Sequence, residues 1–157
     1  MLDCGRKKLS NMGEVNTSSM MKLLVLDYTE DPGPRYIKQG DSSGEEFYLS
    51  TLNKKFAECI RNNSILDIEL DGTSGYPSSF LDEAFGELVY DFSLKEVKNR
   101  VRINTQMFRK RKQQIEEETY PQWEKRRISS DTIVHTASKG TKYFALSNDG
   151  TIMEKTI

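Results

Sequence analysis

The chain has 157 residues, of which 36% are hydrophobic, so it can bury one core of ordinary size and is too short for two large domains. Its 23 basic and 24 acidic side chains give a net charge of -1, which provides no global attraction to nucleic acid or to an anionic membrane. The longest apolar run, Leu23 to Leu26, is far shorter than the roughly 20 residues of a membrane-spanning helix, so we expect a cytoplasmic protein.

The N-terminal 19 residues show no hydrophobic periodicity and are rich in Ser, Asn and Lys, which predicts a disordered leader. They lack the apolar stretch of a secretory signal, which argues against export. Met20 and Met21 directly precede the first apolar segment and are candidate start positions. Cys4 and Cys59 have neither a disulfide-framework nor a metal-ligand spacing, so we expect two reduced thiols and no cofactor.

Next along the chain, a strand and a helix are predicted. The apolar segment Lys22 to Tyr28 ends before Asp31-Pro32-Gly33-Pro34, which indicates a strand closed by a turn. Ser43 and Glu46 then form a capping box at the start of a helix that ends near Asn62. The apolar residues of this helix recur at spacings of three and four: Leu49, Leu52, Phe56 and Ile60.

The middle of the chain predicts a second strand and a second helix. Apolar and acidic residues alternate from Leu66 to Asp71, which indicates a strand with one buried face. The loop Gly72 to Pro77, followed by Ser78 and Ser79, leads to a helix that starts near Phe80. One face of that helix carries Leu81, Ala84, Phe85 and Leu88, which we expect to share a core with the second strand.

A third strand is predicted at Val101–Asn104, followed by a highly charged helix from Gln106 until Pro121 breaks it. The order strand, helix, strand, helix, strand, helix indicates an α/β domain with parallel strands, over residues 20–120.

The segment 121–157 predicts a separate, β-rich C-terminal extension. Turn signals at Lys139-Gly140 and Asn148-Asp149-Gly150 divide it into three short strands, which form a β-meander. The predicted strands are Thr132–Thr136, Lys142–Leu146 and Thr151–Ile157.

Two parts of the sequence resemble a known family: Gly33–Tyr36 with Ser43–Phe47, and the longer and more specific stretch Leu70–Leu88. Together they resemble the prokaryotic STAS-like domain family of unknown function, over Lys22 to Gln114. That family is similar to sulfate-transporter and anti-sigma-factor-antagonist domains. The resemblance implies a mixed sheet with helices mainly on one face.

The resemblance also implies a regulatory docking module and no enzymatic activity. In the antagonists, a serine at the start of the second helix is phosphorylated by an ATP-binding kinase, which switches partner binding. Ser78 and Ser79 match the two serines, whereas Pro77 and Phe80 stand where the antagonists have Asp and Gly. We therefore expect a protein partner, with an ATP-binding kinase-like protein as one candidate. The expected docking or phosphoacceptor residues are Thr73, Ser74, Tyr76, Ser78 and Ser79.

Simpler explanations compete at this loop. Ser79 can cap the helix by accepting a backbone hydrogen bond, without being phosphorylated. The segment Gly72 to Gly75 can hold an anion or nucleotide through its backbone amides, with Arg35 as counter-charge, or its glycines can simply permit a tight turn. The nearby acids can bind a metal, or they can complement the helix dipole: Asp71, Asp82 and Glu83.

Nucleic-acid binding is a second alternative function, through Arg109–Lys112 extended by Lys125–Arg127. The acidic run Glu116–Glu118 can pair with these residues, so a solvated helix face is the simpler interpretation. His135 has no Cys or second His nearby, so we expect no metal site there.

Overall fold

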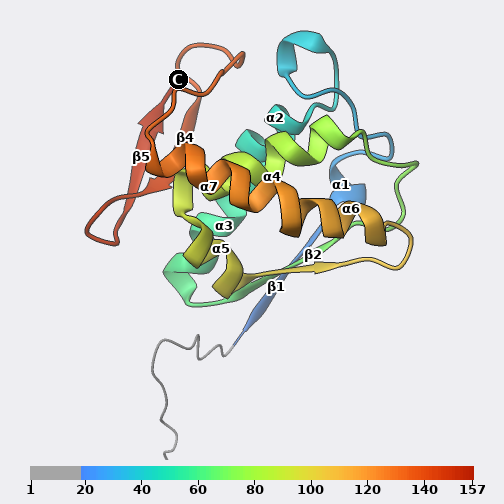
Figure 1. Cartoon of the computed structure of the whole chain (residues 1–157), viewed down its shortest axis with the longest axis horizontal. Helices are drawn as coiled ribbons and strands as arrows, with labels where there is room; N and C mark the ends of the chain where they lie inside the picture. Colours follow the sequence, from blue (N-terminus) through green and yellow to red (C-terminus); the bar gives the residue numbers. More distant parts are fainter. Residues whose placement is uncertain (1–18) are drawn as a thin grey trace, which may run out of the picture.

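The computed structural model describes residues 19–157, so the predicted leader lies outside the described residues apart from Ser19. A parallel sheet consists of β1 (Met20–Leu24), β2 (Ile65–Glu69) and β3 (Val101–Asn104), in that spatial order. Because the strands advance in one direction and right-handed crossovers are strongly favoured, both helical connections lie on the same face. Figure 1 shows the helices on the upper side of the sheet.

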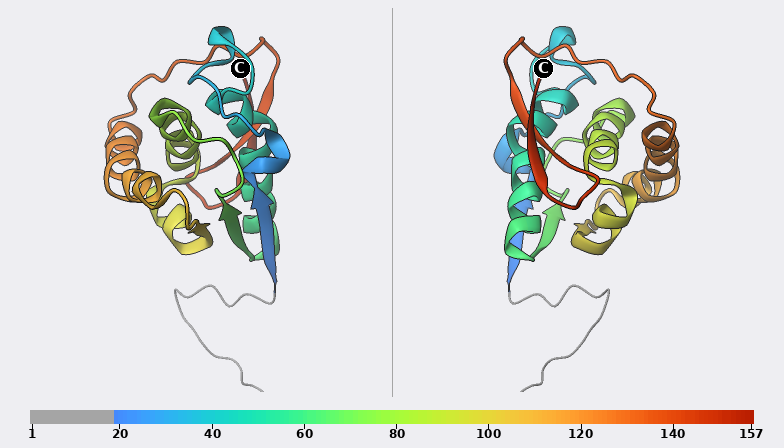
Figure 2. Two further views of the ribbon diagram at one scale, coloured as in Figure 1. Left: turned by 90° about the vertical axis from the view of Figure 1, so that its right-hand side faces the viewer. Right: turned by 90° about the vertical axis from the view of Figure 1, so that its left-hand side faces the viewer.

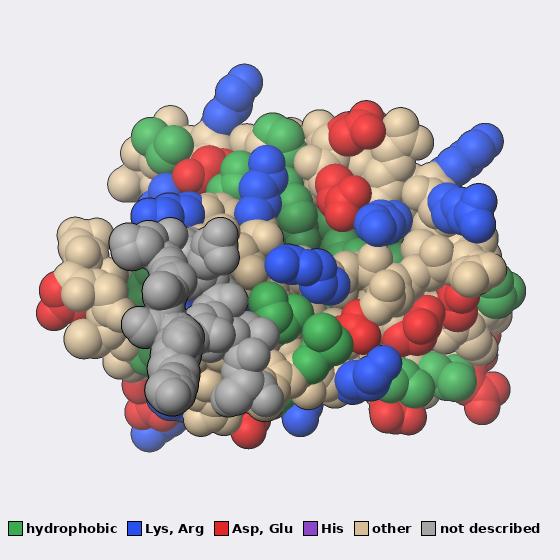
Figure 3. Space-filling view, turned by 90° about the horizontal axis from the view of Figure 1, so that it is seen from below, with side chains coloured by type: hydrophobic (Ala, Val, Ile, Leu, Met, Phe, Trp, Pro, Cys, Tyr) green, Lys and Arg blue, Asp and Glu red, His purple; other side chains and the backbone are tan. Residues whose placement is uncertain are grey.

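The two faces of the sheet differ in chemistry. Toward the helices the strands direct only apolar side chains: Met21, Leu23, Leu66, Ile68, Val101 and Ile103. On the opposite face, Asp67 pairs with Lys22 at 3.2 Å and accepts a hydrogen bond from Asn104. Figure 3, which views the molecule from below, shows charged side chains of both signs on this side. The predicted α/β fold with helices mainly on one face is confirmed.

The first strand is shorter than its sequence predicts. It ends at Leu24, and Val25–Tyr28 forms α1, a single helical turn. The Thr29 N–H donates to the Val25 carbonyl at 3.0 Å and closes this turn. The Tyr28 hydroxyl donates to the Glu46 carboxylate at 2.6 Å, a contact made from the end of the helical turn.

The first long helical segment begins where the capping box predicts. The Ser43 hydroxyl accepts the Glu46 N–H at 3.0 Å at the start of α2 (Gly44–Phe47). One π-helical turn, η3 (Tyr48–Leu52), joins α2 to α3 (Asn53–Asn62). The short 3₁₀ turn η2 (Ile37–Gln39) precedes this segment.

The second long helix, α4 (Ser78–Phe92), lies in the middle of the helical layer and is followed by α5 (Leu94–Arg100). All the residues predicted to join the second strand to this helix are completely buried, which confirms the predicted core: Leu66, Ile68, Leu70, Leu81, Ala84, Phe85 and Leu88.

The charged helix does not end at Pro121, so that prediction is wrong. The structure has α6 (Arg109–Gln114), the π-helical turn η4 (Ile115–Thr119) and α7 (Tyr120–Ile128) in one continuous segment. In η4 the Tyr120 N–H donates five residues back to Ile115. Pro121, which has no N–H, therefore follows a turn in which the regular hydrogen-bond ladder is already interrupted.

The C-terminal part is a hairpin, not a three-stranded meander. Strands β4 (Lys142–Leu146) and β5 (Ile152–Thr156) pair antiparallel, whereas Thr132–Thr136 forms no strand. The Thr136 N–H instead donates a hydrogen bond to the Glu45 carboxylate at 2.6 Å. We call the irregular segment Ser129–Thr141 the strap, and Figure 2 shows it running from α7 across to the hairpin.

The hairpin is attached to α3 through one side chain. The Asn53 amide donates to the Phe144 carbonyl and accepts the Phe144 N–H, both at 2.8 Å. Tyr143 and Trp123, both downstream of the predicted boundary, belong to the main hydrophobic core. The separability of residues 121–157 stays a prediction, and these contacts favour the opposite outcome.

Candidate functional site

The loop between β2 and α4 lies at the carboxyl end of the parallel sheet. Gly72 adopts φ 101°, and a Cβ there would lie 2.9 Å from the Leu26 side chain, so this turn requires glycine. The Ser74 N–H donates to the Glu30 carbonyl at 2.8 Å and fixes the loop against the segment after α1. A rigid turn therefore presents the start of α4.

Two of the expected docking residues are structural. Thr73 and Tyr76 are each only 5% exposed, and the Tyr76 hydroxyl donates to the Leu70 carbonyl at 2.6 Å. The Tyr76 ring also meets Phe108 edge to face, with centroids 5.0 Å apart. These side chains support the loop from inside and do not present a surface.

The serines at the helix start are not caps. Pro77 occupies the N-cap position, and its carbonyl accepts the Phe80 N–H at 3.1 Å, so Ser79 is already the second helical residue. The prediction that Ser79 caps this helix is wrong for that reason. Within residues 19–157, neither the Ser78 nor the Ser79 hydroxyl has a hydrogen-bond partner. Ser78 is exposed and Ser79 is half-buried.

The loop after β3 lies beside this turn and is joined to it by Asp71. The Asp71 carboxylate accepts hydrogen bonds from Thr105 Oγ1, from Gln106 N–H at 2.9 Å and from Met107 N–H at 3.2 Å. The Thr105 hydroxyl, followed by the Gln106 amide, lowers the pKa of Asp71. This carboxylate therefore organises two loops, which is a structural use.

Gln106–Arg111 line a hollow of about 620 Å³. Met107 is 64% exposed there, and Arg109 and Lys110 are exposed and make no ion pair with any described residue. No ion pair joins Arg109–Lys112 to Glu116–Glu118 in the part of the chain that the structure describes. The basic side chains next to the loop are therefore available to a partner.

Ser78 is linked to the basic helix through a side chain. Gln114 Nε2 donates to the Ser78 carbonyl at 3.3 Å, and Arg111 Nη1 donates to Gln114 Oε1 at 3.0 Å. The start of α4 and the basic turn of α6 thus form one surface. We call its exposed residues the docking surface: Gly72, Ser74, Ser78, Met107, Arg109 and Lys110.

Arg35 makes its ion pairs further along α4. Its Nη1 lies 2.8 Å from Asp82 Oδ2 and 3.1 Å from Glu83 Oε1, so two carboxylates offset its charge. Asp82 also accepts hydrogen bonds from Thr119 and Trp123, each at 3.2 Å. Anion binding by Arg35 with Gly72 and Gly75 stays a prediction. The guanidinium would have to bind the anion while it is paired with Asp82 and Glu83.

A row of buried acids on α4 was missed by the sequence analysis. Glu83, Glu87 and Asp91 follow one another at intervals of four residues, and all three are buried. We call them the acid ladder. Burial, followed by the neighbouring Glu83, raises the pKa of Glu87 well above its usual value, and burial raises that of Asp91 to about 7. In the sequence, the interval of four residues between these acids, among the apolar residues of a predicted helix, indicates that they lie on one helix face.

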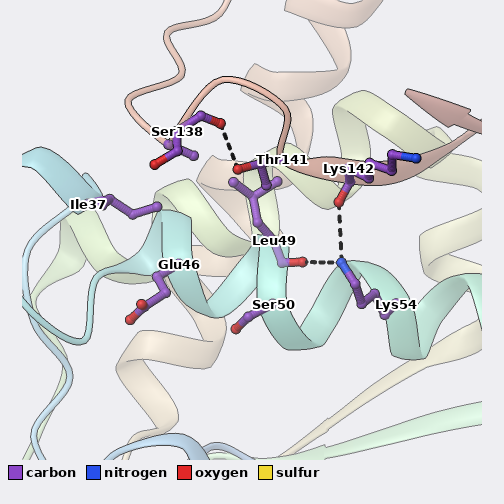
Figure 4. Close-up of a pocket in the computed structure, with 9 residues that line it drawn as sticks. Ile37, Glu46, Leu49, Ser50, Lys54, Ser138, Thr141 and Lys142 are labelled. Atoms are coloured by element: carbon purple, nitrogen blue, oxygen red, sulfur yellow. Dashed lines mark hydrogen bonds between the residues drawn. The ribbon is translucent and has the colours of Figure 1, made fainter. Parts of the chain in front are cut away.

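A second concavity, of about 610 Å³, lies between the α2–α3 segment and the end of the strap, where the chain enters β4 (Figure 4). Lys54 Nζ donates to the carbonyls of Leu49 at 2.8 Å and Lys142 at 3.3 Å. This lysine therefore joins the two walls of the groove. The exposed Ser50 lies on one wall and Ser138 on the other.

Within residues 19–157, no three His, Cys, Asp or Glu side chains are arranged to hold a metal ion. Nor does this part of the chain contain a helix long and apolar enough to cross a membrane.

Comparison with known proteins finds one family similarity, over less than half of the chain. Residues 43–105 match the model of a STAS-like domain of unknown function, which confirms the resemblance over that segment. The match includes α2, β2, α4 and β3, and no catalytic family is indicated. Searches of curated proteins and of solved structures found no match.

Proposed function

Because residues 43–105 match the model of a STAS-like domain of unknown function, we propose that this chain is a non-enzymatic, cytoplasmic regulatory or scaffold module that binds a protein partner through the docking surface. The observation that carries the proposal is the exposed helix start at Ser78 beside unpaired basic side chains. Loops held by a rigid scaffold are the usual location of binding residues.

The charge of this surface indicates the chemistry of the partner. Arg109 and Lys110 lie at the hollow together with the exposed Met107. A partner with acidic residues around an apolar side chain would complement both features. Electrostatic attraction of this kind weakens as salt concentration increases.

Phosphorylation of Ser78 or Ser79 is the proposed switch. A phosphate on Ser78 would meet the free amides at the start of α4 and the guanidinium of Arg111, which is linked to Ser78 through Gln114. It would also place a dianion in front of the acidic partner surface. We therefore expect phosphorylation, by an ATP-dependent kinase-like protein, to weaken binding.

The test uses a partner isolated with the tagged full-length chain from its host, followed by calorimetric titration of the purified pair. We expect Ser78→Asp to weaken binding about tenfold, or about 1.4 kcal/mol. Ser79→Asp should have a smaller effect because that side chain is half-buried, and Ser78→Ala should bind like the wild type.

Ser50→Asp is the matched control, since Ser50 is an exposed serine on the groove of Figure 4. It adds the same charge away from the docking surface and should leave the affinity unchanged. If Ser50→Asp weakens binding and Ser78→Asp does not, the partner binds at the groove and the proposal is wrong.

A further inference from the structure

The strap crosses the acid ladder before it reaches β4. His135 Nε2 lies 3.3 Å from Glu87 Oε1, and the Tyr90 hydroxyl donates to the Asp131 carbonyl at 2.6 Å. Glu45 holds the next two residues, since its carboxylate accepts the N–H groups of Thr136 at 2.6 Å and Ala137 at 3.2 Å. Polar contacts to Tyr90 and to two buried acids, Glu45 and Glu87, therefore anchor the strap.

Glu87 is the unusual member of this group. It is completely buried, and neither carboxyl oxygen accepts a hydrogen bond from any residue within 19–157. An ionised carboxylate without donors is unfavourable in such an environment, whereas a protonated carboxyl can donate to a neighbouring acceptor. Two neighbours are such acceptors: the Glu83 carboxylate on the same helix, and the His135 ring nitrogen of the strap when the imidazole is neutral.

We propose that the strap is a proton-operated latch, in which protonated Glu87 holds His135 against α4 and loss of that proton to solvent releases the strap.

The charges around Glu87 determine the direction of this latch. The negative groups that face it are Glu83 and Asp91 on α4 and Glu45 on α2. Burial, followed by Asp91 and then Glu87, raises the pKa values of Tyr48 of η3 and Tyr143 of β4, which places both hydroxyls near Glu87. Ionisation of Glu87 therefore adds a negative charge to a buried site that is already acidic.

The positive groups nearby do not offset that charge. Arg35 is bound to Asp82 and Glu83. Lys155 of β5 only partly opposes the burial that raises the pKa of Asp91, and it adds to the burial that lowers the pKa of His135. Burial is the main reason why the pKa of His135 is low, so the imidazole does not readily take the proton that Glu87 loses.

The raised pKa of Glu87 agrees with a latch that is closed at neutral pH and opens as pH rises. The strap is the element expected to yield, because it has no helix or strand and several of its residues are exposed. The latch uses no residue of the docking surface and does not depend on the proposed function.

Hydrogen–deuterium exchange of the full-length chain from about pH 6 to about pH 9, corrected for intrinsic exchange, tests the latch. Relative to β2, protection of strap amides in the wild type should fall about tenfold or more. In Glu87→Gln, whose residue 87 cannot ionise, the protection of strap amides should be independent of pH. Glu58→Gln, which removes an exposed acid on α3, should behave like the wild type.

A second variant keeps the test decisive if Glu87→Gln fails to fold. Asp91→Asn removes a negative neighbour that raises the pKa of Glu87, so the release should move to lower pH. Strap protection that does not change with pH in the wild type would overturn the proposal. The proposal would also be overturned if strap protection in Glu87→Gln depended on pH as it does in the wild type. The same holds if the pH midpoint of the release were unchanged in Asp91→Asn.

Discussion

Gly86 and Trp123 are in such close contact that no side chain fits between α4 and α7. A Cβ added to Gly86 would lie 2.2 Å from Cε2 and Nε1 of the Trp123 ring. The indole N–H also donates to Asp82 at 3.2 Å, and the Arg126 guanidinium lies 4.0 Å from the ring centroid. The helix pair is therefore fixed by one aromatic ring packed on a glycine.

Gly86→Ala should destabilise the fold by about 1 to 3 kcal/mol, because the Trp123 ring must move and its hydrogen bond to Asp82 is disturbed. Urea unfolding gives the free energy, and near-ultraviolet circular dichroism reports on Trp123, the single tryptophan. In a Trp123→Leu background the same substitution should be less harmful. Equal losses in the two backgrounds would refute the contact.

Phe85→Ala should cost about 3 to 5 kcal/mol, because the side chain is completely buried in the main hydrophobic core. Phe85→Leu is the conservative control and should cost less. Denaturant titration measures both changes. An unfolding midpoint unaffected by the alanine substitution would show that this helix face does not pack in the core.

Removal of residues 122–157 should strongly destabilise the domain, although the sequence predicts that this segment is separable. Trp123, Tyr143 and Ala145 are all buried, and loss of Trp123 alone is expected to cost about 3 to 5 kcal/mol. Solubility and cooperativity of urea unfolding are the measurements. If the truncated chain unfolds cooperatively at the wild-type midpoint, the sequence-based boundary is correct.

Stability should fall as pH rises from about 4 to about 7. Asp91 has its pKa raised from 3.8 to about 7, so the folded state holds a proton that the unfolded state has lost between these values. The stabilisation is fully present below the pKa of Asp91 in the unfolded chain, 3.8. It is lost as pH rises through the pKa in the folded protein, about 7. Each such group contributes a slope of at most about 1.4 kcal/mol per pH unit.

Asp91→Asn should flatten this dependence, because the amide can still accept the Tyr48 hydroxyl but cannot ionise. Thermal unfolding in a pH series gives the comparison. A profile in Asp91→Asn as steep as that of the wild type would assign the effect to other groups, of which Glu87 is the first candidate.

Hydrophobic periodicity predicted the core well, because one face of β2 and one face of α4 must be buried together. The Ser43 cap was also correct, since it depends only on neighbours three residues apart. Three predictions were wrong, and a distant contact explains only one of them, at Thr136. Pro121 follows a π-helical turn, Thr136 binds Glu45 from a segment 91 residues earlier, and Pro77 takes the cap position expected for Ser79.

The candidate site could be predicted only in part. The exposure of Ser78 follows from its position at a helix start, but the burial of Tyr76 depends on Phe108, which comes from the next strand connection. The basic run was visible in the sequence, whereas its proximity to Ser78 depends on how α6 packs. Nothing local reveals that Glu87 faces His135.

The side-chain amide of Asn53 makes the two backbone hydrogen bonds that a neighbouring strand would make with Phe144. It satisfies both backbone groups of Phe144, so another chain cannot extend the hairpin by pairing at that residue of β4. The other edge of the hairpin, at which a strand of another chain could still pair, is β5. This strand includes the exposed Glu154 and Lys155. Charged side chains on a sheet edge discourage intermolecular pairing. Strand addition at the hairpin is therefore disfavoured at both edges, by the Asn53 amide at β4 and by charged side chains at β5.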